Sequence, residues 1–183
     1  NDVNAIISIS PFYKQKNVNL IDSISNIDTT LINSNKYYRF GIGNDYPKDY
    51  SEMDSVITKF ENSQINSNGY LFKSADHNST PGLTIANALY EIFGYWSEKQ
   101  SNYFSNDQKQ TSIIDSLEKE VSNHYGCNLE FGLGILNGKG WYFYNEGEFN
   151  QAIQAWDILI ENYPNFSEAY LYIMDAQLEL NIN

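Results

Sequence analysis

His77 is the residue whose type and position best suit acid–base chemistry. It lies in the segment SADHNSTP, from Ser74 to Pro81, between a short apolar segment and a helix-forming one. Imidazole takes up and releases a proton near neutral pH. In a parallel α/β sheet, the loops at the carboxyl ends of the strands are where ligands and catalytic groups gather. The sequence therefore makes His77 a candidate general base, although a loop histidine can equally be a surface or capping residue.

The elements on either side of His77 are predicted to be a strand and a helix. Residues 69–73 form an extended segment that follows the turn-forming run 66–68. Ser79 or Thr80 can cap a helix with Pro81 in its first turn, where the missing N–H costs nothing. The apolar residues that follow recur at helical spacing, namely Leu83, Ala86, Tyr90 and Phe93.

The segments that precede His77 predict parallel strands. Val3–Ile9 is nearly all apolar or small, which is typical of a strand covered on both faces, and Tyr37–Gly43 is aromatic and β-branched. One amphipathic helix or two short ones are expected from Asn17 to Asn33, and a further helix from about Asp49 to Ser63, because apolar residues recur there at helical intervals. Strands that alternate with helices are parallel. The first part of the chain is therefore expected to be α/β, with a partial sheet of about three parallel strands.

Two stretches carry a resemblance to a known family. The segment YLFKSADHNSTPGLTIANALYEIFGYW, from Tyr70 to Trp96, resembles the end of the catalytic domain in the enterochelin-esterase and esterase D group of α/β-hydrolases. There, a strand leads into a D-H-x-S-x-P type of turn and then a helix that ends in aromatic residues. Ser10-Pro11-Phe12-Tyr13 is similar to the family's S-P-S-aromatic turn, with phenylalanine in place of the second serine. The resemblance implies ester hydrolysis, and related proteins are commonly exported from bacteria.

The same resemblance assigns roles to two residues. It implies that His77 is the base of a triad whose order in sequence is serine, acid, histidine. Asp45, directly after Tyr37–Gly43, is the best-placed carboxylate to accept the Nδ1 proton and fix the tautomer, unless it only caps a turn. Asp49 and Glu52 are alternatives, but their spacing is that of a capping box.

The sequence offers no nucleophile for this triad. It contains no G-x-S-x-G, the pattern of the nucleophile elbow in α/β-hydrolases. If the resemblance holds, the serine and the first oxyanion-hole loop precede Asn1, and the chain is the C-terminal part of a longer esterase. The chain by itself is then expected not to hydrolyse esters.

Composition narrows the classes of ligand and partner. The formal charge of −12 argues against nucleic acid. The single cysteine, Cys127, excludes an internal disulfide, and His77 and His124 lack the spacing of metal ligands, so neither a metal nor a cofactor is expected. No apolar run reaches the roughly 20 residues of a membrane helix. The compartment stays open, apart from the export that the resemblance implies.

The last third of the sequence resembles a tetratricopeptide repeat. The stretch from Leu133 to Phe166 fits this repeat of about 34 residues over its full length. Ser167–Leu180 continues in phase as the first helix of a second repeat. The matched positions are Leu136, Gly140 and Phe143 in the first helix, Gly147 and Phe149 in the turn, Ala152, Trp156 and Leu159 in the second helix, and Pro164 at its end.

These patterns predict where the regions of the chain begin and end. Residues 1–97 are expected to be the C-terminal portion of an α/β-hydrolase domain, and residues 98–110, polar and without periodicity, a linker. Residues 111–183 are expected to be a helical, tetratricopeptide-like region. Its first helix is predicted from about Thr111 to His124, with Gly126 at its end.

Two functional hypotheses follow. In the first, the chain belongs to a serine ester hydrolase that acts on a small-molecule ester, with His77 as base and Asp45 as acid. In the second, it is a non-catalytic interaction protein whose helical tail binds a partner, although that tail can equally be a structural buttress. A sheet without its first strands leaves Val3–Ile9 as an open apolar edge, so a homodimer through this edge is also expected.

Overall fold

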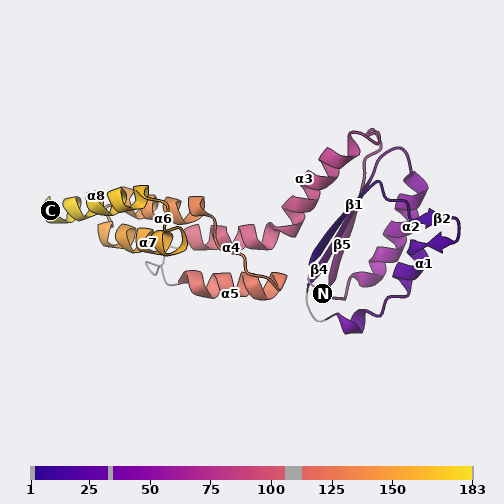
Figure 1. Ribbon diagram of the computed structural model, residues 1–183, viewed down its shortest axis with the longest axis horizontal. Helices are drawn as coiled ribbons and strands as arrows, with labels where there is room; N and C mark the ends of the chain where they lie inside the picture. Colours follow the sequence, from indigo (N-terminus) through magenta and orange to yellow (C-terminus); the bar gives the residue numbers. More distant parts are fainter. Residues whose placement is uncertain (1–2, 33–34, 106–112, 183) are drawn as a thin grey trace. The chain divides into compact units, whose positions relative to one another are not determined.

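The computed structural model describes residues 3–32, 35–105 and 113–182 of the chain (Figure 1). Its contacts define two units, Asn1–Gly94 with His124–Gly126, and Tyr95–Asn123 with Cys127–Asn183. In the described residues, the first unit combines strands with helices and the second contains helices alone. The predicted class, a partial parallel sheet with helices followed by a helical region, is confirmed at this level.

The sheet of the first unit has three parallel strands. They are β1 (Ala5–Ile9), β4 (Lys36–Ile42) and β5 (Ile65–Leu71), in the order β1-β4-β5. The register pairs Ile9 with Gly41 and Gly41 with Tyr70, so all three carboxyl ends lie at one edge. A separate antiparallel pair is formed by β2 (Lys14–Gln15) and β3 (Val18–Asn19).

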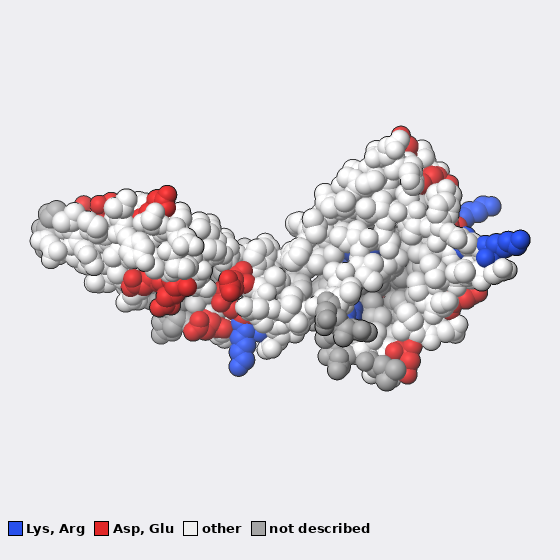
Figure 2. All heavy atoms as spheres, in the orientation of Figure 1, with Lys and Arg blue, Asp and Glu red and all other residues white. Residues whose placement is uncertain are grey.

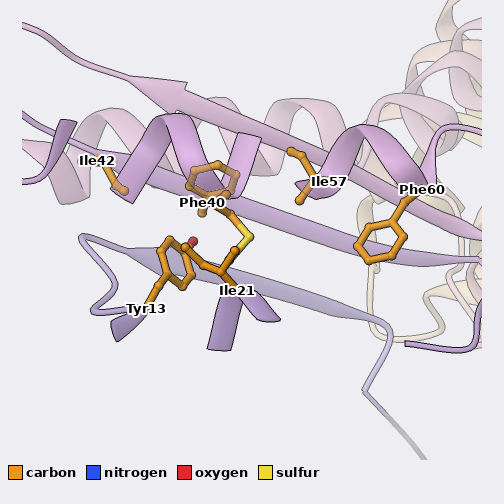
Figure 3. Packing of buried hydrophobic residues seen from close by; sticks show 7 residues of the cluster. Tyr13, Ile21, Phe40, Ile42, Ile57 and Phe60 are labelled. Carbon is orange, nitrogen blue, oxygen red and sulfur yellow. The ribbon is translucent and has the colours of Figure 1, made fainter. Parts of the chain in front are cut away.

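One face of the sheet is covered by α1 (Leu20–Ser25) and α2 (Pro47–Ile57), the latter continued by the 3-10 turn η2 (Thr58–Phe60). Side chains from β4 and from these helices meet in an apolar cluster (Figure 3). This cluster is the core of the first unit on this face. Its buried members are Tyr13, Ile21, Phe40, Ile42, Met53, Ile57 and Phe60.

The other face of the sheet is covered by α3 (Thr80–Ile92), as Figure 1 shows. The buried residues of α3 recur every four positions, so one side of the helix faces the strands. The approach is close because β4 has a glycine at Gly41, where an added Cβ would collide with the side chain of Thr84. The buried residues of α3 are Thr80, Thr84, Ala88 and Ile92.

A buried arginine explains why residues 66–68 are part of β5, although the sequence predicted a turn there. Arg39 is 3% exposed and donates from Nη1 and Nη2 to the backbone and side-chain oxygens of Asn66, at 2.7 and 2.8 Å. Its Nε lies 2.7 Å from Oε2 of Glu91 in α3. The polar residues of this strand therefore satisfy a buried charge, a tertiary contact that local turn propensity does not include.

Two further expectations for the first unit can be compared with the structure. In the segment 17–33, where one amphipathic helix or two short ones are expected, the described part contains β3, α1 and the 3-10 turn η1 (Thr29–Leu31), so two short helical segments form. Its many Asn, Asp and Ser side chains bond to nearby backbone groups and keep the helical segments short: Asn19 and Asp28 cap the N-termini of α1 and η1, and Asn26 Nδ2 donates to Asp22 O at the end of α1. The strand β1 is not covered on both faces, since Ile6 is 52% exposed.

The second unit begins at Tyr95, in α4 (Gly94–Ser105), and most of this helix lies where the sequence predicted a linker. Residues 98–105 are helical, whereas residues 106–110 lie outside the described part of the chain. Gln100 and Tyr103 are buried one turn apart, and Gln100 Oε1 accepts a 2.9 Å hydrogen bond from the Gly132 amide. Contacts of this kind stabilise a helix whose sequence lacks an apolar period.

The remaining helices follow the predicted order. They are α5 (Ile113–Tyr125), α6 (Leu133–Asn145), α7 (Phe149–Asn162) and α8 (Glu168–Ile182). Gly126, with a φ of 67°, follows the last residue of α5, as expected, and Gly147, with a φ of 75°, lies in the turn between α6 and α7. Among the helices that the structure describes, none is both long and apolar enough to cross a membrane.

The core of the second unit lies around Trp156. This side chain is fully buried, and an added Cβ at Gly140 would collide with its indole ring. The helices α6 and α7 therefore approach closely at Gly140, one of the matched positions of the repeat. Other matched positions of the two helices are also buried, namely Leu136, Phe143, Ala152, Trp156 and Leu159.

Candidate active site

Asp45 and His77 lie in two neighbouring loops at the carboxyl edge of the sheet. Asp45 follows β4, and His77 lies between β5 and the start of α3. The two loops are joined by a backbone hydrogen bond from Asn44 N to Ala75 O, 2.8 Å long. The strand order therefore places the two predicted site residues side by side, although 31 residues separate them in sequence (45 to 77).

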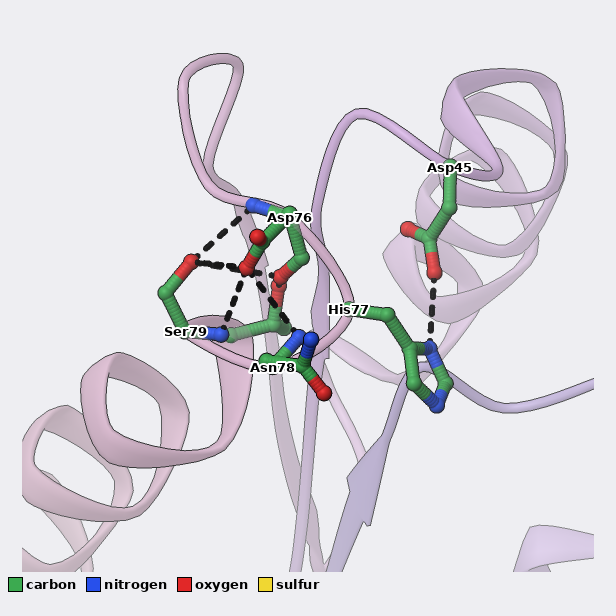
Figure 4. A network of polar contacts seen from close by, with 6 residues as sticks. Asp45, Asp76, His77, Asn78 and Ser79 are labelled. Carbon is green, nitrogen blue, oxygen red and sulfur yellow. Dashed lines mark hydrogen bonds and ion pairs between the residues drawn. The ribbon is translucent and has the colours of Figure 1, made fainter.

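The two side chains are in direct contact. Nδ1 of His77 lies 3.0 Å from Oδ2 of Asp45, and Figure 4 shows the other ring nitrogen pointing away from the carboxylate. The Asp45 side chain is 18% exposed, whereas that of His77 is 67% exposed. The carboxylate is therefore the sheltered member of the pair, and the imidazole is open to solvent.

The charge of Asp45 fixes the roles of the two imidazole nitrogens. Burial raises the pKa of the Asp45 carboxyl, but the hydrogen bond from His77 and those from the backbone lower it by more, so the pKa lies below its ordinary value of 3.8. Asp45 is then ionised at neutral pH and only accepts hydrogen bonds. Nδ1 of His77 consequently carries the proton, and Nε2 of the neutral ring has a lone pair directed away from Asp45.

The turn that carries His77 is held by its neighbours Asp76 and Ser79. Asp76 Oδ1 accepts hydrogen bonds from Ser79 Oγ at 2.7 Å and from Ser79 N at 2.8 Å, while Asp76 N donates to Ser79 Oγ at 3.0 Å (Figure 4). The hydrogen bonds from Ser79 lower the pKa of Asp76. Ser79 precedes α3 as predicted, but its hydroxyl bonds to Asp76 and does not cap the helix.

Gly43 lets the His77 turn lie directly against the end of β4. An added Cβ at this position would lie 2.5 Å from Ala75 O and 2.5 Å from Thr80 Oγ1. Ala75 O also accepts the hydrogen bond from Asn44 that joins the two loops. The distance between Asp45 and His77 therefore depends on the absence of a side chain at Gly43.

Replacing Gly43 by alanine is expected to destabilise the fold by about 1–3 kcal/mol, because backbone and not a flexible side chain must move. The same movement would break the hydrogen bond between Asp45 and His77. Denaturant unfolding measures the first effect, and the NMR signal of the Nδ1 proton measures the second. Gly82→Ala is the matched control, since its Cβ meets nothing within 4 Å. A Gly43→Ala variant as stable as Gly82→Ala, with the Nδ1 signal retained, would contradict the packing argument.

The two alternative acids lie elsewhere. Asp49 is in the first turn of α2, and Glu52 forms an ion pair with Lys14 of β2. The N-terminus of α2 is formed by Tyr46 and Pro47 without a side-chain cap, so the predicted capping box between Asp49 and Glu52 does not form. The structure brings His77 together with Asp45 alone of these three carboxylates.

Ser10 is a further polar residue at the carboxyl end of β1. Its φ of 42° is in the left-handed region, which is uncommon for residues other than glycine. The side chain is buried, and its Oγ has no hydrogen-bond partner within the described residues. A hydroxyl without access to solvent cannot attack a substrate, so Ser10 is not the nucleophile for His77.

His124, the second histidine, contacts residues near the amino end of β4 and is not part of the candidate site. Its Nε2 lies 2.5 Å from the Tyr37 hydroxyl, and Asn35 Nδ2 donates to its backbone oxygen at 3.1 Å. Asn35 also lines a cavity of about 300 Å³ that Ser63 and Asn66 border, at the amino end of β5. Both features lie at the opposite end of the strands from His77.

Sequence reasoning missed the groups that hold the site in place. Gly43 was treated only as the end of a strand, and the reciprocal hydrogen bonds of Asp76 and Ser79 were not foreseen. A signal was present, because Gly41 in β4 and Gly43 directly after it are two residues apart, which is the spacing of neighbours on one face of a strand. Within the described residues, no group of three or more side chains is arranged to hold a metal ion.

Comparison with known proteins supports the fold alone. No family model matches the chain, and no curated protein matches it. A crystal structure of an uncharacterised protein from Capnocytophaga ochracea DSM 7271 is similar, with a TM-score of 0.55 and 10% sequence identity over 97% of this chain. The match covers 51% of that protein, so this chain spans about half of its length.

Proposed function

We propose that this chain is the base-bearing part of a serine ester hydrolase that acts on a small-molecule ester. His77 is the general base and acid, Asp45 orients it, and a segment outside these 183 residues supplies the nucleophilic serine. The observation that carries the proposal is the 3.0 Å contact between His77 Nδ1 and Asp45 Oδ2 at the carboxyl edge of a parallel sheet. The resemblance of Tyr70–Trp96 to the esterase D group agrees with it.

The geometry suits proton transfer at Nε2. As the serine oxygen bonds to the ester carbonyl carbon, Nε2 takes the hydroxyl proton, and the imidazolium is stabilised by the carboxylate of Asp45. The imidazolium then gives this proton to the departing alkoxide, which leaves as the alcohol. Water repeats the two steps on the acyl-enzyme and releases the acid. Asp45 keeps its charge throughout, because its role is to hold the Nδ1 proton and the ring orientation.

The exposure of His77 suits a base that acts on a serine in another segment of the protein. His77 lies on an open surface, and β1 has no strand partner on its outer edge within the described residues. Further strands added at that edge would continue the sheet and bring another carboxyl end next to those of β1 and β4. In this proposal, the walls of the substrate pocket and the oxyanion hole come from that segment.

Covalent labelling of the longer parent protein tests the proposal. A fluorophosphonate probe reacts with a serine activated by a histidine base, so the intact protein is expected to be labelled and to hydrolyse short p-nitrophenyl esters. The 183-residue chain is expected to show neither reaction. Mass spectrometry locates the label. An unlabelled parent protein, or a label on a serine within these 183 residues, would overturn the proposal.

The open edge of β1 predicts the oligomeric state of the 183-residue chain. Two copies are expected to pair through this edge, because it presents unpaired backbone groups and the exposed side chains of Val3 and Ile6. Light scattering should give twice the chain mass of 21.0 kDa. An Ile6→Lys variant should give the single mass, since a charge on an edge strand opposes pairing. A wild-type chain that stays monomeric at high concentration would end this prediction.

A further inference from the structure

The helix α8 is buried on one side and apolar on the other. Ala169 and Ala176 are fully buried, and the ring of Tyr172 packs 5.4 Å from that of Trp156 in α7. On the opposite side, four large apolar residues are 51–60% exposed; the first two lie four and three positions before the third, and the fourth follows four positions later, so they form a continuous row. We name this row, Tyr170, Leu171, Met174 and Leu178, the outer stripe of α8.

An exposed row of this kind needs an explanation, because scattered apolar residues are common on surfaces but contiguous ones are not. The helix is the last one of the repeat-like region that the structure describes. A helix that caps such a region normally has a polar outer face. The outer stripe of α8 is apolar instead, so it has the character of a contact surface.

Acidic residues border the outer stripe. Glu168 lies three residues before Leu171, and Asp175 lies four residues after it, so both are neighbours of the stripe on the helix surface. Both side chains are exposed. From residue 140 onward the sequence has no Lys or Arg, and Figure 2 shows only acidic charges over α7 and α8, at the left end of the view.

The nearest basic residue in the sequence does not offset these charges. Lys139 of α6 is 2% exposed, and its Nζ donates to Phe104 O at 2.8 Å. Its charge is therefore directed into the helical unit. The surface over α7 and α8 presents apolar side chains in a negative field, which attracts cations and repels anionic lipid or nucleic acid.

The spacing of the outer stripe selects a helical partner. Each of α6 and α7 packs its apolar side against the next helix along the chain, and the outer stripe is the corresponding surface of α8 for one more helix. A second copy of α8 is disfavoured, because its own Glu168 and Asp175 would be brought against the same acidic border. A helix with apolar residues on one side and Lys or Arg beside them has the complementary surface.

We propose that the outer stripe of α8, together with Glu168 and Asp175, binds a cationic amphipathic helix of another protein. Met174 and Leu178 provide the apolar anchors at the centre of the contact. The acidic border gives the contact its preference for basic partners and raises the rate of association. This binding function is independent of the chemistry at His77.

Binding of model peptides to the 183-residue chain tests the proposal. The probe is a labelled peptide of about 18 residues, with Leu at i, i+3, i+4 and i+7 and Lys at the other positions. Fluorescence anisotropy is expected to show binding that weakens as salt is added. A peptide with Glu in place of Lys, and a Lys peptide with the Leu positions scrambled, are each expected to bind at least about tenfold more weakly.

Substitutions on α8 locate the contact. Met174→Ser and Leu178→Ser are each expected to raise Kd by about tenfold or more, and Asp175→Asn should raise it several-fold at low salt. Asp157→Asn, an exposed acid of α7, is the matched control and should leave Kd unchanged. All four side chains are exposed, so the thermal melts of these variants should match that of the wild type.

Four outcomes would overturn the proposal. Equal binding of the scrambled Lys peptide would mean that net charge alone attracts it. Unchanged binding by Met174→Ser and Leu178→Ser would place the contact elsewhere. A chain dimer that these two substitutions dissociate in light scattering would assign the outer stripe to a second copy, and sedimentation of the chain with phosphatidylcholine vesicles, lost in the same variants, would assign it to lipid.

Discussion

Replacing His77 by alanine in the intact protein should lower kcat/KM for a short acyl ester by on the order of 10³-fold, since general acid–base catalysis by a positioned side chain contributes about 10²–10⁴-fold. The loss should fall mainly on kcat, because the imidazole acts on the proton in the transition state and not on substrate binding. Initial rates with p-nitrophenyl butyrate measure it. Labelling by a fluorophosphonate should slow in parallel, because the serine loses its base.

The controls for this prediction come from the same site. Asn78→Ala alters the same turn but keeps the hydrogen bond to Asp76 Oδ1, because the backbone N–H of Asn78 donates it, so its rates should equal those of the wild type. Asp45→Asn keeps the size of the side chain but removes the charge that holds Nδ1–H, and it should lower kcat without raising KM. Full activity of His77→Ala would exclude the proposed role of this residue.

The largest effect on stability is expected from Phe40→Ala. Phe40 is fully buried at the centre of the apolar cluster, and its ring lies in the space that the absent side chain of Gly69 leaves (Figure 3). Its ring also lies 5.6 Å from that of Tyr50 in α2. Removing it should cost about 3–5 kcal/mol, the range for a buried phenylalanine truncated to alanine. Urea unfolding followed by circular dichroism gives this difference.

Tyr90→Ala is the comparison for Phe40→Ala. It also removes an aromatic ring, but Tyr90 is 83% exposed on α3, so the change in unfolding free energy should stay within about 0.5 kcal/mol. Similar losses in the two variants would mean that the cluster around Phe40 does not dominate the stability of the first unit.

The parallel sheet could be predicted because its strands have a clear local signal. The aromatic and β-branched segment at Tyr37–Gly43 forms β4 within one residue of the expected bounds. The helices α6 and α7 were predictable for a different reason, since Gly140 and Trp156 are matched positions of one repeat and lie against each other. Local patterns succeed where side chains and backbone favour the same structure.

Other elements could not be predicted because distant residues stabilise them. The strand segment 66–68 contains turn-forming residues, and only its contacts with Arg39 and Glu91 explain its extended form. Likewise, α4 has no apolar period, and its helix depends on contacts such as that between Gln100 and Gly132. Neither contact is visible in the local sequence.

The candidate site was predictable in its members but not in its geometry. The order of strands and helices places the loops after β4 and β5 at one edge, so Asp45 was the expected neighbour of His77. The sequence could not show that Glu52 turns to Lys14, nor that the Ser79 hydroxyl bonds to Asp76. The hydrolytic role and the missing nucleophile remain predictions that the experiments above address.

Gly41 and Gly43 have a consequence for how this site can vary among related sequences. The chain at Gly41 lies against the side chain of Thr84 in α3, and the chain at Gly43 lies against the backbone of the His77 turn at Ala75, so a side chain at either position has no free space. Substitutions on the surrounding surface should leave the distance between Asp45 and His77 unchanged, whereas one added methyl group at Gly41 or Gly43 would alter it. Related sequences with the same chemistry are therefore expected to keep these two glycines, although neither glycine takes part in the reaction.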